Sequence, residues 1–232
     1  MKALVLSSGG VDSTTCIAIA INKYGKENVI TASLYYGQKH EKELECARKI
    51  AEYYGVQHIE EDISNIMKYA NNVCSLIKGG EDIEHTSYDR QVKANKDGRV
   101  KTYVPFRNGL LLSIATSYAD SLFPNEDVEI YYGAHADDNI GHAYADCSPE
   151  FASAIDKAIN IGTYGRIRVA RPLINLNKTQ VVKIGLELKA PYELTWSCYE
   201  GREKQCGTCG TCIDRKRAFT ENGVKDPVDY EI

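Results

Sequence analysis

The residues best suited to chemistry lie in a turn near the N-terminus, S-G-G-V-D-S-T at positions 8–14. An apolar run at 3–6 precedes this turn and an alanine- and isoleucine-rich segment at 16–24 follows it, which predicts a strand, a turn and a helix. Glycines let the backbone approach a ligand closely, and the N–H groups and dipole at a helix start attract a phosphate. The turn matches neither G-x-x-x-x-G-K-[ST] nor G-x-G-x-x-G. It is therefore a phosphate-binding turn of another kind, unless it is an ordinary Gly-Gly turn with a helix cap.

Four of the eight cysteines form a second group, close to the C-terminus. Cys198, Cys206, Cys209 and Cys212 follow the spacing C-x7-C-x2-C-x2-C, with glycines between the last three. Zn²⁺ binds four thiolates tetrahedrally, and glycine permits the tight turns that this spacing requires. The spacing predicts one structural zinc ion per chain, with an iron–sulfur cluster as the alternative. The other four cysteines are scattered, and we expect most of them to be free thiols.

Further polar residues follow predicted strands, at the carboxyl ends where ligands bind in parallel sheets. The sequence Tyr35-Tyr36-Gly37-Gln38 follows a strand predicted at 29–34. The sequence Gly133-Ala134-His135-Ala136-Asp137-Asp138 follows a strand predicted at 128–132. These carboxylates can hold Mg²⁺ on nucleotide phosphates, or they can cap the next helix.

Two basic residues stand at predicted helix starts. Arg107, followed by Asn108, precedes an apolar helix at 110–118, and its planar fork suits a phosphate or a carboxylate. The plainer interpretation is a surface ion pair for Arg107 and an N-cap for Asn108. Lys178 begins the segment that leads into a helix at 181–188, where it either reaches a nucleotide phosphate or is solvated.

The order of elements predicts an α/β fold. The first sixty residues alternate strand and helix, which implies a doubly wound, mostly parallel sheet with helices on both faces. We expect a helix at 65–77, another at 151–161 and a strand at 167–171. The polar stretch 78–98 is either a lid or interface segment or a plain solvated loop. We expect a nucleotide-binding domain at 1–190 and a small zinc-binding segment at 191–232, packed on that domain.

Composition limits the class of protein. The chain has 232 residues and a net charge of −4, so its overall charge does not indicate a nucleic-acid-binding protein. No apolar run approaches the ~20 residues that span a bilayer. The N-terminus leads directly into a predicted core strand without a signal peptide. We therefore expect a cytoplasmic protein with reduced thiols, in which clustered cysteines favour metal over disulfides.

Several motifs together resemble a known family. S-G-G-x-D-S at 8–13 is similar to the pyrophosphate loop (PP-loop) of the N-type ATP pyrophosphatases, whose fold is adenine nucleotide alpha hydrolase-like. V-P-F-R-N at 104–108, and P-Y-E-L-T-W-S-C-Y at 191–199 running into the cysteines, resemble the 7-cyano-7-deazaguanine synthase (preQ0 synthase) family of queuosine and archaeosine biosynthesis. Y-G-Q-x-H at 36–40 and Y-A-D-C-S-P-E-F at 144–151 also match, although Ala145 and Ser148 replace the usual Pro and Arg. Extra residues also lie between 138 and 144.

The resemblance implies a ligase that forms C–N bonds, with ATP and Mg²⁺ as co-substrate. 7-Carboxy-7-deazaguanine would be adenylated and attacked by ammonia to give an amide, and a second activation would dehydrate the amide to the nitrile, 7-cyano-7-deazaguanine (preQ0). Free ammonium is the expected nitrogen source, because no glutaminase signature is present. The family also implies a homodimer without membrane or direct nucleic-acid partners. Whether the nucleotide product is AMP or ADP stays open.

The resemblance also assigns residues. Catalytic roles fall on Asp12, Ser13, Arg107 and Lys178, with Asp12 or Asp138 as possible Mg²⁺ ligands. The predicted ATP contacts are Ser7, Ser8, Gly9, Gly10, Val11, Asp12, Ser13, Thr14, Thr15 and Cys16. The predicted substrate contacts are Tyr36, Gln38, Arg107, Asn108, His135, Asp138 and Asp146. The deazapurine is expected to stack on Tyr35, Tyr36 or Tyr103. The predicted metal ligands are Cys198, Cys206, Cys209 and Cys212.

Three other functions stay open. A tRNA thiolase of the same superfamily would need a catalytic cysteine near the loop, and Cys16 follows it. Another ATP-dependent amidating enzyme is a closer alternative. The third is a non-catalytic module that binds zinc and nucleotide through a degenerate loop, against which the acidic balance argues.

Overall fold

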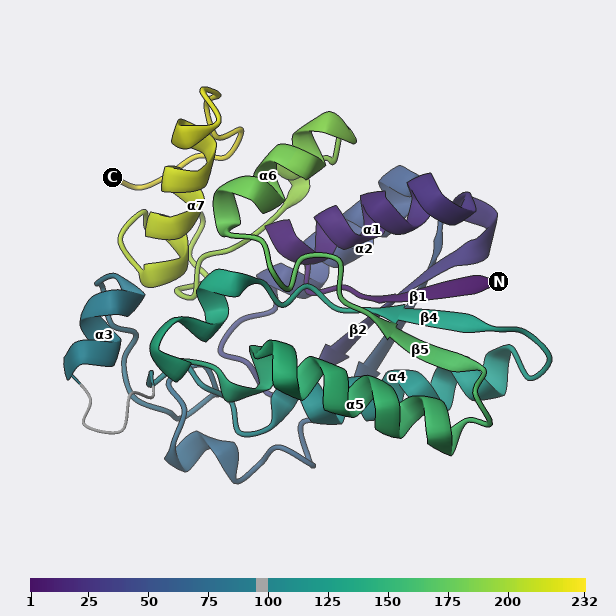
Figure 1. Cartoon of the computed structure of the whole chain (residues 1–232). Helices are drawn as coiled ribbons and strands as arrows, with labels where there is room; N and C mark the ends of the chain where they lie inside the picture. Colours follow the sequence, from purple (N-terminus) through teal and green to yellow (C-terminus); the bar gives the residue numbers. More distant parts are fainter. Residues whose placement is uncertain (95–99) are drawn as a thin grey trace.

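The computed structural model describes residues 1–94 and 100–232, and in this part of the chain five strands form one sheet (Figure 1). Every strand pairs in parallel with its neighbours, in the order β3-β2-β1-β4-β5. Leu4 of the central strand lies opposite Ile30 on one side and Ile130 on the other. The strands are β1 (Lys2–Leu6), β2 (Val29–Tyr35), β3 (Gln57–Asp62), β4 (Val128–Tyr131) and β5 (Ile167–Ala170).

Helices cover both faces of this sheet. The α-helices are α1 (Val11–Tyr24), α2 (Lys42–Tyr54), α3 (Tyr88–Ala94), α4 (Arg107–Leu122), α5 (Pro149–Gly162), α6 (Lys178–Glu187) and α7 (Gly210–Glu221). Short 3₁₀ helices are η1 (Lys26–Asn28), η2 (Ala70–Asn72), η3 (Ala136–His142), η4 (Ala145–Cys147) and η5 (Tyr192–Leu194). Figure 1 shows α4 and α5 below the sheet and α1, α2 and α6 above it. The predicted doubly wound fold is confirmed, with all of the described strands parallel.

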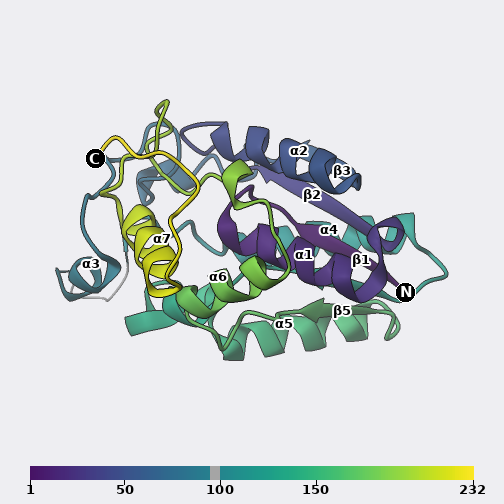
Figure 2. The ribbon, with the colours of Figure 1, turned by 90° about the horizontal axis from the view of Figure 1, so that it is seen from above.

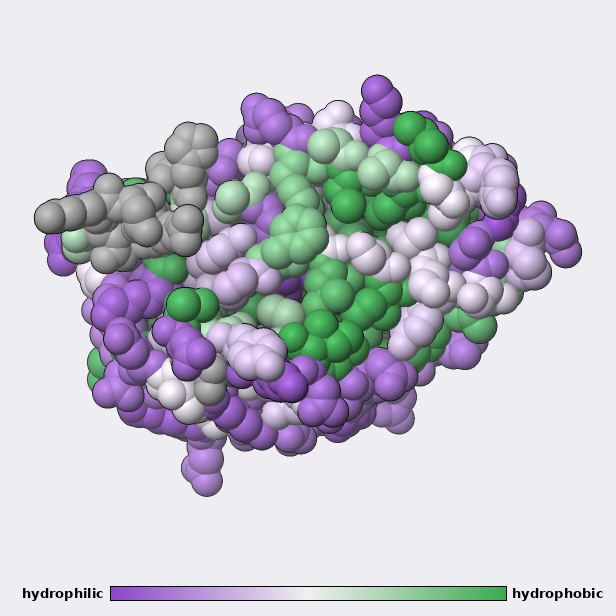
Figure 3. Space-filling model, turned by 90° about the horizontal axis from the view of Figure 1, so that it is seen from below, coloured by the Kyte–Doolittle hydropathy of each residue, from purple (hydrophilic) through white to green (hydrophobic). Residues whose placement is uncertain are grey.

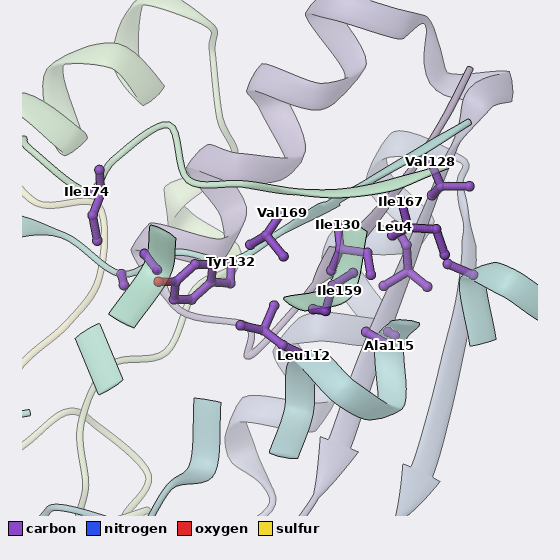
Figure 4. Close-up of a cluster of buried hydrophobic side chains, with 14 of the residues drawn as sticks. Leu4, Leu112, Ala115, Val128, Ile130, Tyr132, Ile159, Ile167, Val169 and Ile174 are labelled. Carbon is purple, nitrogen blue, oxygen red and sulfur yellow. The ribbon is translucent and has the colours of Figure 1, made fainter. Parts of the chain in front are cut away.

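Alternate residues of the strands form two separate cores. Leu4, Ile130 and Val169 point toward α4 and α5, where they pack against Leu112 and Ile159 (Figure 4). Their neighbours point to the opposite face, against α1, α2 and α6. The buried residues there are Ala3, Val5, Cys16, Ile17, Ala20, Val29, Ile50, Tyr131, Leu173 and Val181. Burial on both faces explains why these strands read as continuous apolar runs. The sheet is thereby fixed between two helical layers, and its carboxyl edge is left for polar loops.

The helix predicted at 65–77 is wrong. This segment consists of turns with only the short η2, and its end pairs with the loop after β2 through an antiparallel bridge between Gln38 and Ile77. The backbone of Leu76 accepts a hydrogen bond from Lys39 at 2.9 Å. Pairing with another loop therefore replaces the local helical hydrogen bonds. Most of the polar stretch 78–98 is described and contains α3, while its residues 95–98 lie outside the described residues.

The C-terminal segment crosses the carboxyl edge of the sheet. Helix α7 packs beside α6, and α3 lies next to the start of α7 in two views at right angles (Figures 1 and 2). The side chain of Arg215 on α7 is fully buried and binds both oxygens of Asp226, at 2.8 and 2.9 Å. The same guanidinium donates to Thr195 Oγ1 at 2.7 Å. Arg215 thus joins three parts of the segment 191–232. None of the described helices is long and apolar enough to cross a membrane.

Candidate active site

A cavity of about 250 Å³ lies at the carboxyl edge of the sheet. Its walls come from the turn after β1, the loops after β2 and β4, and the starts of α1, α2, α4 and α6. The segment 191–232 closes it with Trp196, Ser197, Tyr199, Thr211 and Asp214. Such an edge is where ligands bind in open parallel sheets. The cavity is the candidate active site.

The glycine turn forms the floor of this cavity with its backbone groups available. Gly9 has a φ of 77°, and a Cβ there would lie 2.1 Å from the backbone oxygen of Glu43, so only glycine fits. The backbone oxygen of Gly9 also accepts a hydrogen bond from the backbone N–H of Trp196 at 2.9 Å. Helix α1 begins after Gly10 without a side-chain cap. Its first N–H groups and its dipole therefore favour an anion at this point.

One wall beside the turn carries paired charges; we call Asp12, His135, Asp138 and Lys178 the phosphate wall. The Lys178 ammonium donates to both carboxylate oxygens of Asp12 at 2.6 Å, and His135 Nε2 lies 3.7 Å from Asp12. Burial alone would raise the pKa of Asp12, but the charges of Lys178 and His135 outweigh it, so this pKa lies below its ordinary value. Lys178 is only 6% exposed, so it is not a solvated lysine. Asp138 accepts from the His135 backbone N–H at 3.1 Å, as expected for a capping residue.

The loop after β2 and the start of α4 meet across the cavity. Arg107 Nη1 donates to the Tyr36 hydroxyl at 3.3 Å, and its guanidinium lies 5.6 Å from the centre of that ring. Arg107 is half-buried in the cavity lining, so it is not a surface ion pair. The backbone N–H of Asn108 donates to Asp146 at 2.9 Å. Asp146 therefore fixes the start of α4 from outside the cavity lining. The N-cap position of α4 belongs to Phe106, not to Asn108.

The structure brings most of the sequence-predicted residues to one cavity. Its lining includes Ser7, Ser8, Gly10, Val11, Asp12, Ser13, Tyr36, Gln38, Arg107, Asn108, His135, Asp138 and Lys178. It does not include Gly9, Thr14, Thr15, Cys16 or Asp146. The hydroxyls of Thr14 and Thr15 donate to backbone oxygens of the preceding turn, and Cys16 is fully buried in the core. Of the three tyrosines proposed for stacking, Tyr36 lines the cavity and Tyr35 and Tyr103 do not.

Sequence reasoning identified only Tyr36 of a second wall, made of aromatic side chains. Tyr36, Tyr88, Tyr144, Trp196 and Tyr199 line the cavity, and we call them the aromatic wall. The hydroxyls of Tyr88 and Tyr199 are 2.7 Å apart, and the Tyr144 hydroxyl is hydrogen-bonded to Thr102. Burial raises the pKa of Tyr88 and of Tyr199 far above the ordinary value, so both phenols stay neutral. The spacing of the five aromatic residues in the sequence gives no signal, because they come from four separate segments.

The four C-terminal cysteines converge. All four are buried, and their sulfur atoms lie within 4.8 Å of one another. The Cys198 sulfur accepts backbone N–H groups of Glu200 and Cys206 at 3.4 and 3.3 Å, and the Cys206 sulfur accepts from Thr208 and Cys209 at similar distances. Such N–H donors stabilise thiolates rather than thiols. Four thiolates about one centre match the ligand set of a structural metal ion.

The fold and this edge place the chain among the α/β proteins with a PP-loop-like turn and an added four-cysteine centre. Residues 2–223 match the family model described as "Queuosine biosynthesis protein QueC". The chain therefore belongs to the QueC family, as the sequence motifs predicted.

Individual relatives agree over the whole chain. It is 43% identical to the 7-cyano-7-deazaguanine synthase of Caldicellulosiruptor saccharolyticus, covering 100% of this chain and 96% of that protein. It is 39% identical to the 7-cyano-7-deazaguanine synthase of Archaeoglobus fulgidus, covering 98% and 90%. Among solved structures, the NMN synthetase of Francisella tularensis is similar at a TM-score of 0.51 and 13% identity, covering 97% of this chain and 78% of that one. This last likeness concerns the fold alone. The relatives are named as synthases, so the prediction of an enzyme is confirmed at the level of the family.

Proposed function

We propose that this protein converts 7-carboxy-7-deazaguanine, ammonium and ATP to 7-cyano-7-deazaguanine, in the queuosine pathway. The observation that carries the proposal is one cavity that combines an uncapped helix start, a wall of paired charges with a buried lysine, and an aromatic wall. A nucleotide triphosphate and a flat heterocyclic acid need these features next to each other. The 43% identity to a synthase of that name over the full chain supports the same substrates.

In this proposal the phosphate wall activates the substrate oxygen. ATP phosphates lie on the N–H groups at the start of α1, and Lys178 turns from Asp12 to a phosphate oxygen. Asp12 or Asp138 then offers carboxylate oxygens to Mg²⁺, which prefers such ligands. Positive charge at the departing phosphates stabilises the negative charge that develops in the transition state. The carboxylate oxygen of the substrate leaves with the nucleotide instead of as oxide.

The aromatic wall holds the deazapurine in this proposal. Tyr36 lines the cavity beside Arg107, whose planar fork can bind the substrate carboxylate and keep it near the glycine turn. Ammonia attacks the activated carbonyl carbon to give the amide. Activation of the amide oxygen and loss of protons from nitrogen then give the C≡N bond, so one site performs the same oxygen activation twice.

We propose that the four cysteines hold one Zn²⁺ with a structural role. Four thiolates leave no open coordination position, and a spacing within 4.8 Å suits a single ion at ~2.3 Å from each sulfur. A cubane iron–sulfur cluster holds its cysteine sulfurs farther apart than a single ion does. The zinc would fix the turns that carry Trp196 and Tyr199 into the cavity wall, in a segment 191–232 that packs on the ATP-binding part at 1–190.

We also propose a homodimer. The face of the molecule seen from below carries hydrophobic areas between hydrophilic ones (Figure 3). Helices α4 and α5 lie on this side in Figure 1, and they expose Leu122 and Ile161. An exposed apolar area of this kind is typical of a protein–protein interface.

Mass spectrometry of the purified protein with ATP, Mg²⁺, ammonium and 7-carboxy-7-deazaguanine tests the proposed function. We expect the nitrile, with the amide appearing transiently, together with AMP or ADP. Amide alone would refute the second activation at this site. A folded, zinc-loaded sample that gives no product would refute the function. A thiolase is disfavoured because Cys16 is fully buried, and burial raises the pKa of its thiol.

A further inference from the structure

One acidic residue of the cavity stands apart from the phosphate wall. Glu43 lies in the first turn of α2 and lines the cavity with Tyr36, Gln38 and Arg107. Its backbone oxygen touches the glycine turn so closely that Gly9 has no room for a Cβ. The first turn of α2 is therefore fixed against the point where we place the phosphates. In the proposed function, a group on this turn lies near the reacting end of the substrate.

The other cavity carboxylates already have partners. Asp12 binds Lys178 at 2.6 Å, and Asp138 accepts from the His135 backbone at 3.1 Å. Asp214 lies 3.3 Å from Arg217. Among the residues that the structure describes, Glu43 has no cation within 4.0 Å and no side-chain hydrogen bond. Its carboxylate is thus available to a ligand.

The surroundings of Glu43 also favour proton transfer. Burial raises its pKa to about 7, against the opposing charge of Arg107. The Arg107 guanidinium is directed at the Tyr36 hydroxyl instead, at 3.3 Å. A general base is most effective when its pKa lies near the operating pH. A carboxylate at an ordinary pKa would be a much weaker base.

We propose that Glu43 is the general base that removes a proton from the nitrogen nucleophile in the amide-forming step. The inference rests on the proposed function. Ammonium gives one proton to the Glu43 carboxylate, and the lone pair of the resulting ammonia forms the C–N bond to the activated carbonyl carbon. The C–O bond to the nucleotide then breaks, and its electron pair leaves with the nucleotide. A second proton leaves the nitrogen of the adduct and passes to solvent, which gives the neutral amide.

His40 is the competing base. It also lines the cavity, and its Nδ1 is buried without a hydrogen-bond partner in the described part of the chain. Its ring lies edge-on to Trp196 at 6.4 Å between centres. Burial lowers its pKa below the ordinary value, so His40 is a weaker base than free histidine. Packing against Trp196 therefore accounts for His40 without a role in proton transfer.

The test separates oxygen activation from nitrogen attack. Substrate labelled with ¹⁸O in its carboxylate is mixed with ATP and Mg²⁺, first without ammonium and then with it. Transfer of ¹⁸O to the nucleotide product reports activation, and mass spectrometry of the amide and nitrile reports attack. We expect Glu43→Gln to keep ¹⁸O transfer within about 3-fold of wild type and to lose about 100-fold in amide formation. Glu43→Asp keeps a carboxylate, so its rate of amide formation should be at least about a tenth of the wild-type rate.

Two further variants serve as comparisons. Glu45→Gln removes an exposed acid from the same turn of α2, outside the cavity, and should match wild type in both readings. His40→Gln should leave the ratio of amide formation to ¹⁸O transfer unchanged. If Glu43→Gln lost ¹⁸O transfer and amide formation equally, Glu43 would be a substrate-binding residue and the proposal would be overturned. The proposal would also be overturned if His40→Gln, and not Glu43→Gln, lowered the ratio of amide formation to ¹⁸O transfer. If the wild-type protein showed no ¹⁸O transfer, this would instead refute the proposed function on which the role of Glu43 rests.

Discussion

The two walls of the cavity are held by different interactions. The phosphate wall consists of charges that satisfy one another, with Lys178 on both oxygens of Asp12 at 2.6 Å. The aromatic wall consists of neutral phenols and an indole, and two of its members, Trp196 and Tyr199, flank the metal-ligand candidate Cys198. Changes in the first wall should therefore affect chemistry while the fold persists. Changes in the four-cysteine cluster should affect the second wall and the fold together.

The largest effect is expected from Cys206→Ser. This substitution removes one of four thiolates, and structural zinc contributes roughly 10 kcal/mol to the folding of small zinc domains. Bound zinc, measured by elemental mass spectrometry, should fall from one per chain to almost none. The midpoint of thermal unfolding should fall with it, and nitrile formation should be lost. Cys46→Ser, a half-buried cysteine outside the cluster, is the matched control and should keep its zinc. A soluble, active and metal-free Cys206→Ser protein would contradict the structural role.

A smaller effect, confined to the phosphate wall, is expected from Asp12→Asn. The amide keeps the shape of the side chain and an oxygen that accepts from Lys178, but it removes the negative charge that we propose for Mg²⁺ binding. Turnover should fall by at least about 1,000-fold, as when a group that stabilises transition-state charge is lost. Zinc content and the circular dichroism spectrum should stay as in wild type. Turnover within about 10-fold of wild type would show that another residue takes this role.

The difference between the walls also explains what the sequence could predict. The glycine turn is a contiguous motif between an apolar strand and a helix, so residues 3–24 reveal it without any tertiary contact. The pairing of Asp12 with Lys178 spans 166 residues, and it depends on the strand order that brings α6 beside α1. The aromatic wall depends on tyrosines from separate segments. No local pattern records either arrangement.

Helix α7 shows a further limit of pattern reading. Its buried face carries Cys212, Arg215, Ala218 and Phe219, at helical spacing. A charged residue in the centre of that face interrupts the helical spacing of apolar residues, so the helix was not predicted. Arg215 is tolerated there because Asp226 neutralises it, and Thr195, Ser197 and the Tyr192 carbonyl accept its other N–H groups. The error at 65–77 has the opposite cause, because its apolar residues pair with another loop rather than with a helical turn.

The smallest effect is expected from the aromatic wall itself, at Tyr36. Stacking of a base on an aromatic ring is worth about 1–3 kcal/mol, so Tyr36→Leu should raise the KM for the deazapurine by about 10-fold and leave kcat within about 3-fold. Tyr36→Phe removes only the hydroxyl that accepts from Arg107, and its KM should stay closer to that of wild type.

Steady-state kinetics with each substrate varied in turn decide where the Tyr36 ring binds. Tyr35→Leu is the matched control, because Tyr35 precedes Tyr36 on the chain but lies outside the cavity lining, beside Lys78. If Tyr36→Leu raises the KM for ATP instead, the ring stacks on adenine and the deazapurine must lie against Tyr88, Tyr144 or Tyr199. The nucleotide site would then reach from the phosphate wall to the loop after β2. The aromatic wall would in that case contact both ATP and the deazapurine.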